Sequence, residues 1–149
     1  MNTYKGYFKP RNPAKYKGNP TNIIYRSRWE LFFMSKLDEH PDVISWGSEE
    51  LIIPYRSPID GRIHRYFPDF IVTMINRNGI KETKLLEIKP LAQTKPPVLT
   101  EGKKKTKRYI NEVMTWGVNE AKWKAAIEFC KDRGWTFQVI TERELGLTF

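Results

Sequence analysis

The chain has 149 residues, of which 40% are hydrophobic and 13% aromatic, enough for one domain with a buried core and too few for two. The lack of any long apolar run argues against a membrane span, and we expect no secretory signal at the start. Because Cys130 is the single cysteine, an internal disulfide or a cysteine-rich zinc site is excluded, and a reducing, cytoplasmic-type setting is expected.

The basic charge of the chain is concentrated in two segments. Lys and Arg number 26 against 17 Asp and Glu, a net charge of +9. Residues 1–30 and residues 89–108 each hold seven basic residues and one acid, which leaves −3 for the rest. A nearly neutral body with two basic segments predicts a polyanionic partner, most simply nucleic acid. The alternative is that both segments are merely solvated.

The first elements are an arm and a helix. Residues 1–22 contain three prolines and two glycines without periodicity, which predicts an irregular basic N-terminal arm that either wraps the domain or reaches a ligand. Residues 23–149 then form the folded domain. Its first helix is predicted over residues 27–40, with Ser27 as the N-cap and an apolar repeat formed by Trp29, Phe33 and Leu37.

Strands and helices follow in a mixed order. Short strands are predicted at 43–48 and 51–55, and a longer one over 62–75. The Asn78-Gly79 turn then leads to a returning antiparallel strand over 80–90. After a loop to Gly102, further elements are predicted: helices at 104–115 and 119–133, Gly134 as the residue that ends the second helix, and a last buried strand at 135–141. This order predicts an α/β or α+β domain on a small mixed central sheet flanked by helices.

The segment FPDFIV, residues 67–72, places a carboxylate in hydrophobic surroundings. Burying Asp69 is costly unless a cation meets it. At the far end of the returning strand, Glu87 and Lys89 are two residues apart and therefore share one face. Because Asp69 and Glu87 each lie about nine residues from the Asn78-Gly79 turn, antiparallel pairing places them opposite each other. Two carboxylates and an ammonium group are thus predicted to converge.

This convergence favours a divalent cation. Mg²⁺ typically takes one or two carboxylates together with water and phosphate oxygens, and it can lower the pKa of a bound water. Lys89 would then steady the nucleophile or the scissile phosphate. The alternative is an ordinary cross-strand ion pair at a sheet edge, but such a pair would not need the apolar flanks that surround Asp69.

The pattern resembles a known nuclease signature. Pro68-Asp69 followed by Glu87-Ile88-Lys89 is similar to the motif of the PD-(D/E)xK superfamily. Over nearly the whole length, three segments resemble the head-completion nucleases of tailed bacteriophages, which are related to the endonuclease subunit of heteromeric transposases. These segments are TYKGYFKPRNPAKYKGNPTNIIYRSRWEL, HRYFPDFIV and LLEIKPLAQTKPP.

The resemblance implies a restriction-endonuclease-like core and a Mg²⁺-dependent DNA endonuclease, with Mn²⁺ as a substitute metal. It implies a catalytic set of Asp69, Glu87 and Lys89, with Glu30 as an additional acid and the Ile88 carbonyl as a backbone ligand. It also implies a role in finishing DNA-filled heads before tails attach, in the host cytoplasm, with head or portal proteins as partners and retention in the virion left open. Transposase relatives can have glutamine at the position of Glu87. With Glu87, this chain has the ordinary two-carboxylate metal site.

Several further residues have two interpretations. Glu30 also completes the capping box Ser27-x-x-Glu30. His64 could act as a general base, but its spacing places it on the face opposite Asp69. Contact with the DNA backbone or ordinary solvated charge is predicted for Arg26, Arg28, Gln93, Lys95, Lys103, Lys104 and Lys105. The five tryptophans are predicted as core rather than as platforms for base stacking, with Trp46 and Trp116 left open.

Two other classes of function remain open at this stage. One is a structural head or neck protein that binds DNA or the portal and has an inactive site. The other is a junction-resolving or repair nuclease, which would cleave branched DNA far better than linear duplex. Phosphate contacts carry no sequence information, so weak base specificity and strong salt dependence are expected for the nuclease.

Overall fold

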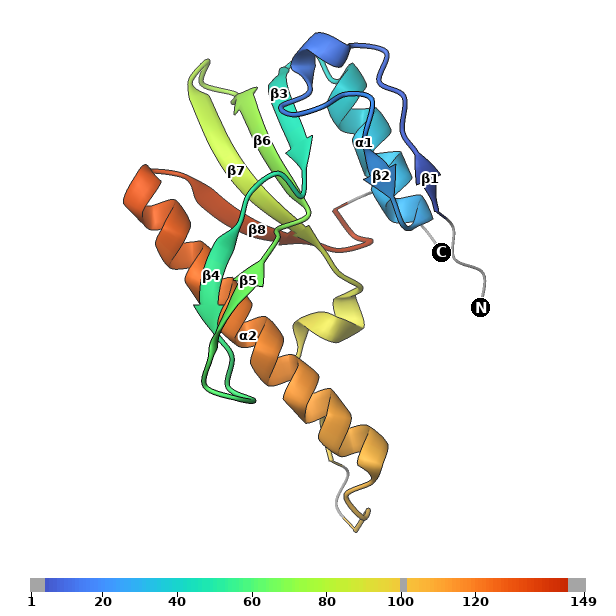
Figure 1. Ribbon diagram of the computed structural model, residues 1–149, viewed down its shortest axis with the longest axis vertical. Coiled ribbons are helices and arrows are strands. Elements are labelled where there is room, and N and C mark those ends of the chain that lie inside the picture. Colours follow the sequence, from blue (N-terminus) through green and yellow to red (C-terminus); the bar gives the residue numbers. More distant parts are fainter. Residues whose placement is uncertain (1–4, 100–101, 145–149) are drawn as a thin grey trace.

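A four-stranded mixed sheet forms the centre of the molecule (Figure 1). The computed structural model describes residues 5–99 and 102–144. The sheet has the order β3-β6-β7-β8, in which the first two pairs are antiparallel and the last is parallel. Its strands are β3 (Val43–Ser48), β6 (Phe70–Ile75), β7 (Lys81–Ile88) and β8 (Thr136–Ile140).

Helices cover the two faces of this sheet (Figure 1). On one face, Phe70 and Leu86 pack with Met34 of α1 (Arg28–Glu39). On the other, Ile71 and Leu85 pack with α2 (Lys107–Arg133). The alternation of side chains along β6 and β7 therefore supplies both cores. This arrangement confirms the predicted α+β class and is consistent with the restriction-endonuclease-like core.

The β6–β7 hairpin is formed where the sequence predicts it. Gly79 has φ +74°, a conformation that glycine adopts without steric cost, and its amide donates to the carbonyl of Asn76 at 2.9 Å. The pairing register runs from Ile75 opposite Lys81 to Phe70 opposite Leu86. The turn thus fixes which residues meet at the far end of the hairpin.

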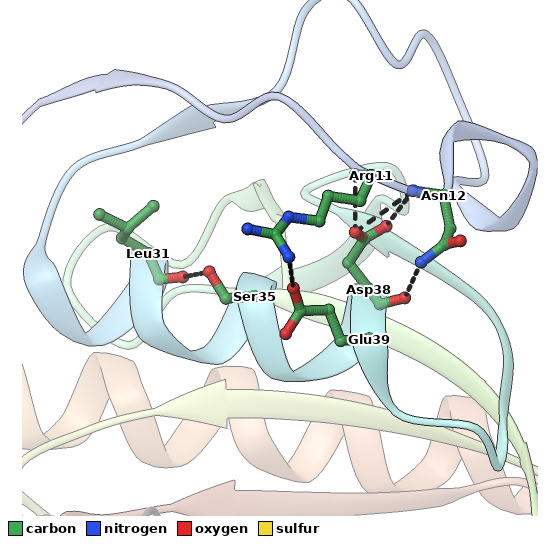
Figure 2. A network of polar contacts seen from close by, with 6 residues as sticks. All are labelled: Arg11, Asn12, Leu31, Ser35, Asp38 and Glu39. Atoms are coloured by element: carbon green, nitrogen blue, oxygen red, sulfur yellow. Dashed lines mark hydrogen bonds and ion pairs between the residues drawn. The ribbon is translucent and has the colours of Figure 1, made fainter.

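The described part of the N-terminal arm lies against the domain. Its short strand β1 (Gly6–Tyr7) pairs with β2 (Ile24–Tyr25), and the turn η1 (Pro13–Lys15) lies between them. Asp38 at the end of α1 is buried and accepts the main-chain amides of Arg11 at 2.8 Å and Asn12 at 3.3 Å (Figure 2). Phe8, Tyr16 and Ile23 complete the core on this side.

The predicted strand over 62–75 is wrong, because the structure divides it in two. β5 (Ile63–Tyr66) pairs with β4 (Ile53–Arg56) in a separate hairpin, and β6 starts only at Phe70. Pro68 lies at the break; it has no amide to donate, so it cannot continue a strand ladder. The break moves the chain from the β4–β5 hairpin to the central sheet and places Asp69 directly before β6, an inner strand of that sheet.

The two helices predicted between residues 104 and 133 are one continuous helix, α2. Thr106 caps it by accepting the Tyr109 amide at 3.1 Å, and Gly134 ends it in the left-handed conformation, as predicted. Gly117 does not interrupt the helix; a Cβ there would lie 3.7 Å from Pro58 of the β4–β5 hairpin. Packing thus outweighs the cost of glycine, which is about 1 kcal/mol. Within the described residues, neither helix is both long and apolar enough to cross a membrane.

Candidate active site

Asp69 and Glu87 face each other where the β6–β7 pairing ends. The last ladder pair is Phe70 with Leu86, so the next pair outward is Asp69 with Glu87. Their carboxyl groups are hydrogen-bonded to each other. Asp69 Oδ2 also accepts the Ile88 amide at 2.7 Å. The predicted register is confirmed, and it brings two carboxylates from distant parts of the chain into contact.

Glu87 is buried among donors and cations. Only 7% of its surface is exposed, and it accepts the hydroxyl of Tyr66 from β5. The positive charges of Lys89 and Lys122 both act on it. The Lys89 amide donates to Ile140 of β8 at 2.9 Å, which extends β7 and keeps Lys89 on the same side as Glu87. A half-buried ammonium group therefore accompanies the carboxylate pair, as predicted.

The two carboxyl groups do not both ionise easily. Burial, followed by the charge of Glu87, raises the pKa of Asp69 to about 8. Burial also raises the pKa of Glu87, although hydrogen bonds from Tyr66 and Asp69 and the two lysines oppose this shift. The same burial and the nearby Glu87 raise the pKa of the Tyr66 hydroxyl, so it remains a donor. Without a cation, the pair therefore retains a shared proton near neutral pH.

Glu30 lies near this pair but is not joined to it. Burial raises the pKa of Glu30, and the charges of Asp69 and Glu49 raise it further. In a capping box the Glu30 carboxylate would accept the Ser27 amide. Instead, its Oε2 accepts the amide of the preceding residue, Arg26, at 3.0 Å. The other half of the capping box is present, because Ser27 Oγ accepts the Glu30 amide at 3.1 Å. Glu30 thus caps α1 and lies within electrostatic reach of Asp69, and its role as a metal ligand stays a prediction.

The donor set of the pair fits a hard divalent cation. Asp69 and Glu87 present carboxylate oxygens, which Mg²⁺ prefers, and a cation would replace the proton that the pair otherwise shares. In the described part of the chain, no group of three or more His, Cys, Asp or Glu is arranged to hold a metal ion. The protein ligands that the geometry offers are therefore two carboxylates, with Glu30 outside that group.

The other predicted residues lie in different surroundings. Arg26 forms an ion pair with Glu49 at 2.7 Å, and Arg28 is exposed at the start of α1. His64 lies on β5 with Nε2 2.8 Å from Asp60, in the separate β4–β5 hairpin. Two hollows lie beside α2. One is lined by Gln93 of η2 (Leu91–Thr94) and by Lys95, which follows η2, and the other by Lys103 and Lys104. Lys105 is exposed, and Lys103, Lys104 and Lys105 all precede α2.

Tyr66 and Lys122 are site residues that the sequence interpretation missed. The Lys122 ammonium lies over the rings of Tyr66 and Tyr55, 5.6 and 5.8 Å from their centroids. A usable signal exists for Lys122: it occupies the middle of the apolar helical repeat Val118, Lys122, Ala126, where a charged residue needs a partner. No comparable signal marks Tyr66, because Pro68 breaks the strand between it and Asp69.

Comparison with known proteins supports a nuclease. Residues 40–142 match the family model described as "TnsA-like endonuclease N terminal". The chain is also 44% identical over 150 residues to the "Head completion nuclease" of Enterobacteria phage T4, with 96% of each chain covered. No solved structure matches the chain. The matched family region includes Asp69, Glu87, Lys89 and Lys122, whereas Glu30 precedes it.

Proposed function

Because the chain belongs to the TnsA-like endonuclease family, we propose that it is a metal-dependent endonuclease that hydrolyses DNA phosphodiester bonds. The observation that supports this most directly is the buried contact between the carboxyl groups of Asp69 and Glu87 beside Lys89. A structural protein gains nothing from holding two carboxylates together out of water, since they repel each other. A hydrolase gains a ligand pair for a cation.

Each residue of the site then has a role. Asp69 and Glu87 would hold Mg²⁺, or Mn²⁺ in its place, with the Ile88 carbonyl as a further ligand. Glu30 lies outside this group, so it would have to turn away from the Arg26 amide to become an additional ligand. When bound, such an ion supplies an acidified water and stabilises charge on the phosphate. Lys89 would donate a hydrogen bond to the attacking water or to a phosphate oxygen. Tyr66 would keep the Glu87 carboxylate oriented, in the manner of hydrogen bonds that support metal ligands.

DNA would be held mainly through its phosphates. The candidate contacts come from the start of α1 and from the loop before α2, and they are Arg26, Arg28, Gln93, Lys95, Lys103, Lys104 and Lys105. Contacts of this kind position the backbone without identifying bases, so binding should be only weakly sequence-specific. It should weaken steeply with salt, because each neutralised phosphate releases counterions.

The setting we propose is phage assembly. The similarity to a protein named head completion nuclease supports a role in finishing DNA-filled heads before tails attach. The protein would then act in the host cytoplasm during assembly, beside head or portal proteins, and retention in the virion would follow if it stays bound to them.

The direct test is cleavage of supercoiled plasmid by purified protein with Mg²⁺, with Mn²⁺ and with a chelator. We expect nicking that requires the metal and is lost in Glu87→Ala and Lys89→Ala. The matched controls are Glu82→Ala and Lys84→Ala on the same strand, which should remain active because these side chains pair with each other outside the site. Cleavage that persists in Glu87→Ala would indicate a contaminating nuclease. Metal-independent DNA binding without any cleavage would favour the structural head or neck protein.

A further inference from the structure

A groove lies between the chain that follows β7 and the first half of α2. Its volume is about 520 Å³, and one wall is formed by Ala92, Gln93 and residues 95–98. The opposite wall is the face of α2 that bears Arg108, Trp116 and Asn119. The groove therefore combines amide, aromatic and cationic side chains in one place.

Asn119 is the least expected member of this lining. Only 8% of its surface is exposed, and within residues 5–99 and 102–144 its side-chain amide makes no hydrogen bond. In this part of the chain the buried side-chain atom without a partner is Nε1 of Trp46, so the Asn119 amide still reaches solvent. Because Asn119 lines the groove, its amide is available to a donor and an acceptor of a molecule bound there.

Trp116 gives the groove an aromatic wall. Its ring contacts Trp123 edge to face, with centroids 5.9 Å apart, and the residue is only half-buried. A half-buried aromatic side chain beside amides that make no hydrogen bond within the described residues suits a nucleobase, which has a flat face and an edge of donors and acceptors.

The charge of the groove suits a phosphate backbone. Lys95 and Arg108 line it, and a neighbouring hollow of about 250 Å³ shares Arg108 and is lined by Lys103 and Lys104. The acid common to both hollows is Glu112, which is paired with Arg108 at 3.2 Å. The cations thus outnumber the acid where the strand would run.

The groove starts beside the candidate active site. Asn119 and Lys122 are three residues apart on α2, so they share a face and are separated by only about 4.5 Å along the helix axis. Lys122 acts on Glu87, and the other wall follows directly from Lys89 through Pro90 and η2. A strand with one phosphate at Asp69 and Glu87 would therefore extend into the groove.

We propose that this groove binds an unstacked nucleotide of the DNA strand next to the cleavage point. The base would stack on Trp116 and bond to the amides of Asn119 and Gln93, so that Gln93 would contact this base and not a phosphate. Lys95 and Arg108 would hold its phosphates. This inference rests on the proposed nuclease function and refines its substrate. A base within a duplex cannot offer its face to a side chain, so the preferred DNA would have unpaired nucleotides beside the cut.

The test is binding of labelled DNA in a chelator, by fluorescence anisotropy, with blunt duplex and with the same duplex bearing a single-stranded overhang. Wild type should bind the overhang DNA more tightly. Trp116→Leu should weaken binding of the overhang DNA about 5-fold or more and leave blunt duplex unchanged. The matched control is Trp135→Leu, which removes a half-buried tryptophan at the other end of α2. Gln93→Ala, an exposed position, provides a second variant should Trp116→Leu fail to fold.

Equal binding of both DNAs by wild type, or equal losses in Trp116→Leu and Trp135→Leu, would overturn the proposal. Plasmid cleavage with Mg²⁺, measured in parallel, separates this outcome from a failure of the nuclease assignment. A wild-type protein that cleaves DNA but shows no preference for the overhang contradicts the groove proposal alone. One that neither binds nor cleaves DNA contradicts both.

Discussion

The carboxylate of Asp69 accepts the main-chain amide of Ile88 at 2.7 Å, across the end of the β6–β7 pair. That amide belongs to the residue after Glu87, so the contact fixes Asp69 at the position where it meets the second carboxylate. The backbone geometry of the sheet therefore brings the acidic pair together. This arrangement has consequences for the charge of the site and for metal binding.

The first prediction concerns pH and stability in the absence of a metal. The pKa of Asp69 is raised from 3.8 to about 8, so between these values the folded chain holds a proton that the unfolded chain releases. Stability should therefore fall as pH rises from about 4 to about 8 and level off above, by an amount on the order of a few kcal/mol. Asp69→Asn keeps a neutral group able to donate to Glu87, so this fall should be largely absent. Thermal unfolding from pH 5 to 9 in a chelator measures it, and similar curves for both proteins would contradict it.

The second concerns metal binding without reference to activity. A cation that binds only the folded pair stabilises it by about 2.7 kcal/mol at one hundred times its dissociation constant, which corresponds to a rise in Tm of about 5–10 °C. We expect Mg²⁺ to raise the Tm of wild type at pH 8 and to have no effect on Glu87→Gln. Glu82→Gln is the control on the same strand and should respond like wild type. A shift of equal size in Glu87→Gln would place the metal elsewhere.

The third concerns the Tyr66 hydroxyl. Tyr66→Phe removes the donor to Glu87 and leaves a buried carboxylate less well held. We expect the affinity for Mg²⁺ to fall about 10- to 100-fold. The dependence of the Tm on Mg²⁺ concentration measures this affinity. The stability of the metal-free protein should change by only about 1 kcal/mol. Tyr55→Phe is the matched control, because Tyr55 also lies under Lys122 but makes no hydrogen bond to Glu87 in the described residues. Equal effects in both variants would show that general packing is responsible.

Local rules explain how much of this site the sequence predicts. The Asn78-Gly79 turn sets the hairpin register, and counting outward from it places Asp69 opposite Glu87, as the structure confirms. The same counting fails before Pro68, because the hydrophobic pattern continues across the break while the backbone leaves the sheet. Tyr66 then reaches Glu87 from a separate hairpin. The chemical roles of these residues stay predictions.

Tertiary packing explains the remaining differences. The sequence predicts two helices, over 104–115 and 119–133, but α2 runs unbroken from Lys107 to Arg133 and packs on the sheet through residues such as Ala126 and Cys130. That continuity aligns Asn119 and Lys122 on one face. Neither position is marked by a turn or a cap, so only the assembled sheet and helix show what these side chains meet.

The fourth prediction concerns Lys122. Its charge lowers the pKa of Glu87, so Lys122→Met should raise that pKa and require a higher pH for the pair to ionise. The pH profile of Mg²⁺-dependent cleavage should therefore shift upward, by about half a unit or more for a half-buried charge. The control is Lys124→Met, since Lys124 is exposed and pairs with Glu120. An unchanged profile with a uniformly lower rate would mean that Lys122 acts on the DNA and not through Glu87.

The fifth prediction concerns the arm that packs on α1. Asp38 is 1% exposed and accepts the amides of Arg11 and Asn12, so Asp38→Ala leaves two main-chain donors without their acceptor (Figure 2). Each unsatisfied donor costs about 1–3 kcal/mol, and the loss should appear as a lower denaturant midpoint. Glu39→Ala is the control on the neighbouring residue: its ion pair with Arg11 at 3.2 Å is largely exposed and should contribute below about 0.5 kcal/mol. If both variants unfold at the wild-type midpoint, the arm does not depend on Asp38 for its attachment. A loss in Asp38→Ala alone, together with faster proteolysis near residues 9–20, would show that this buried carboxylate holds the arm on the domain.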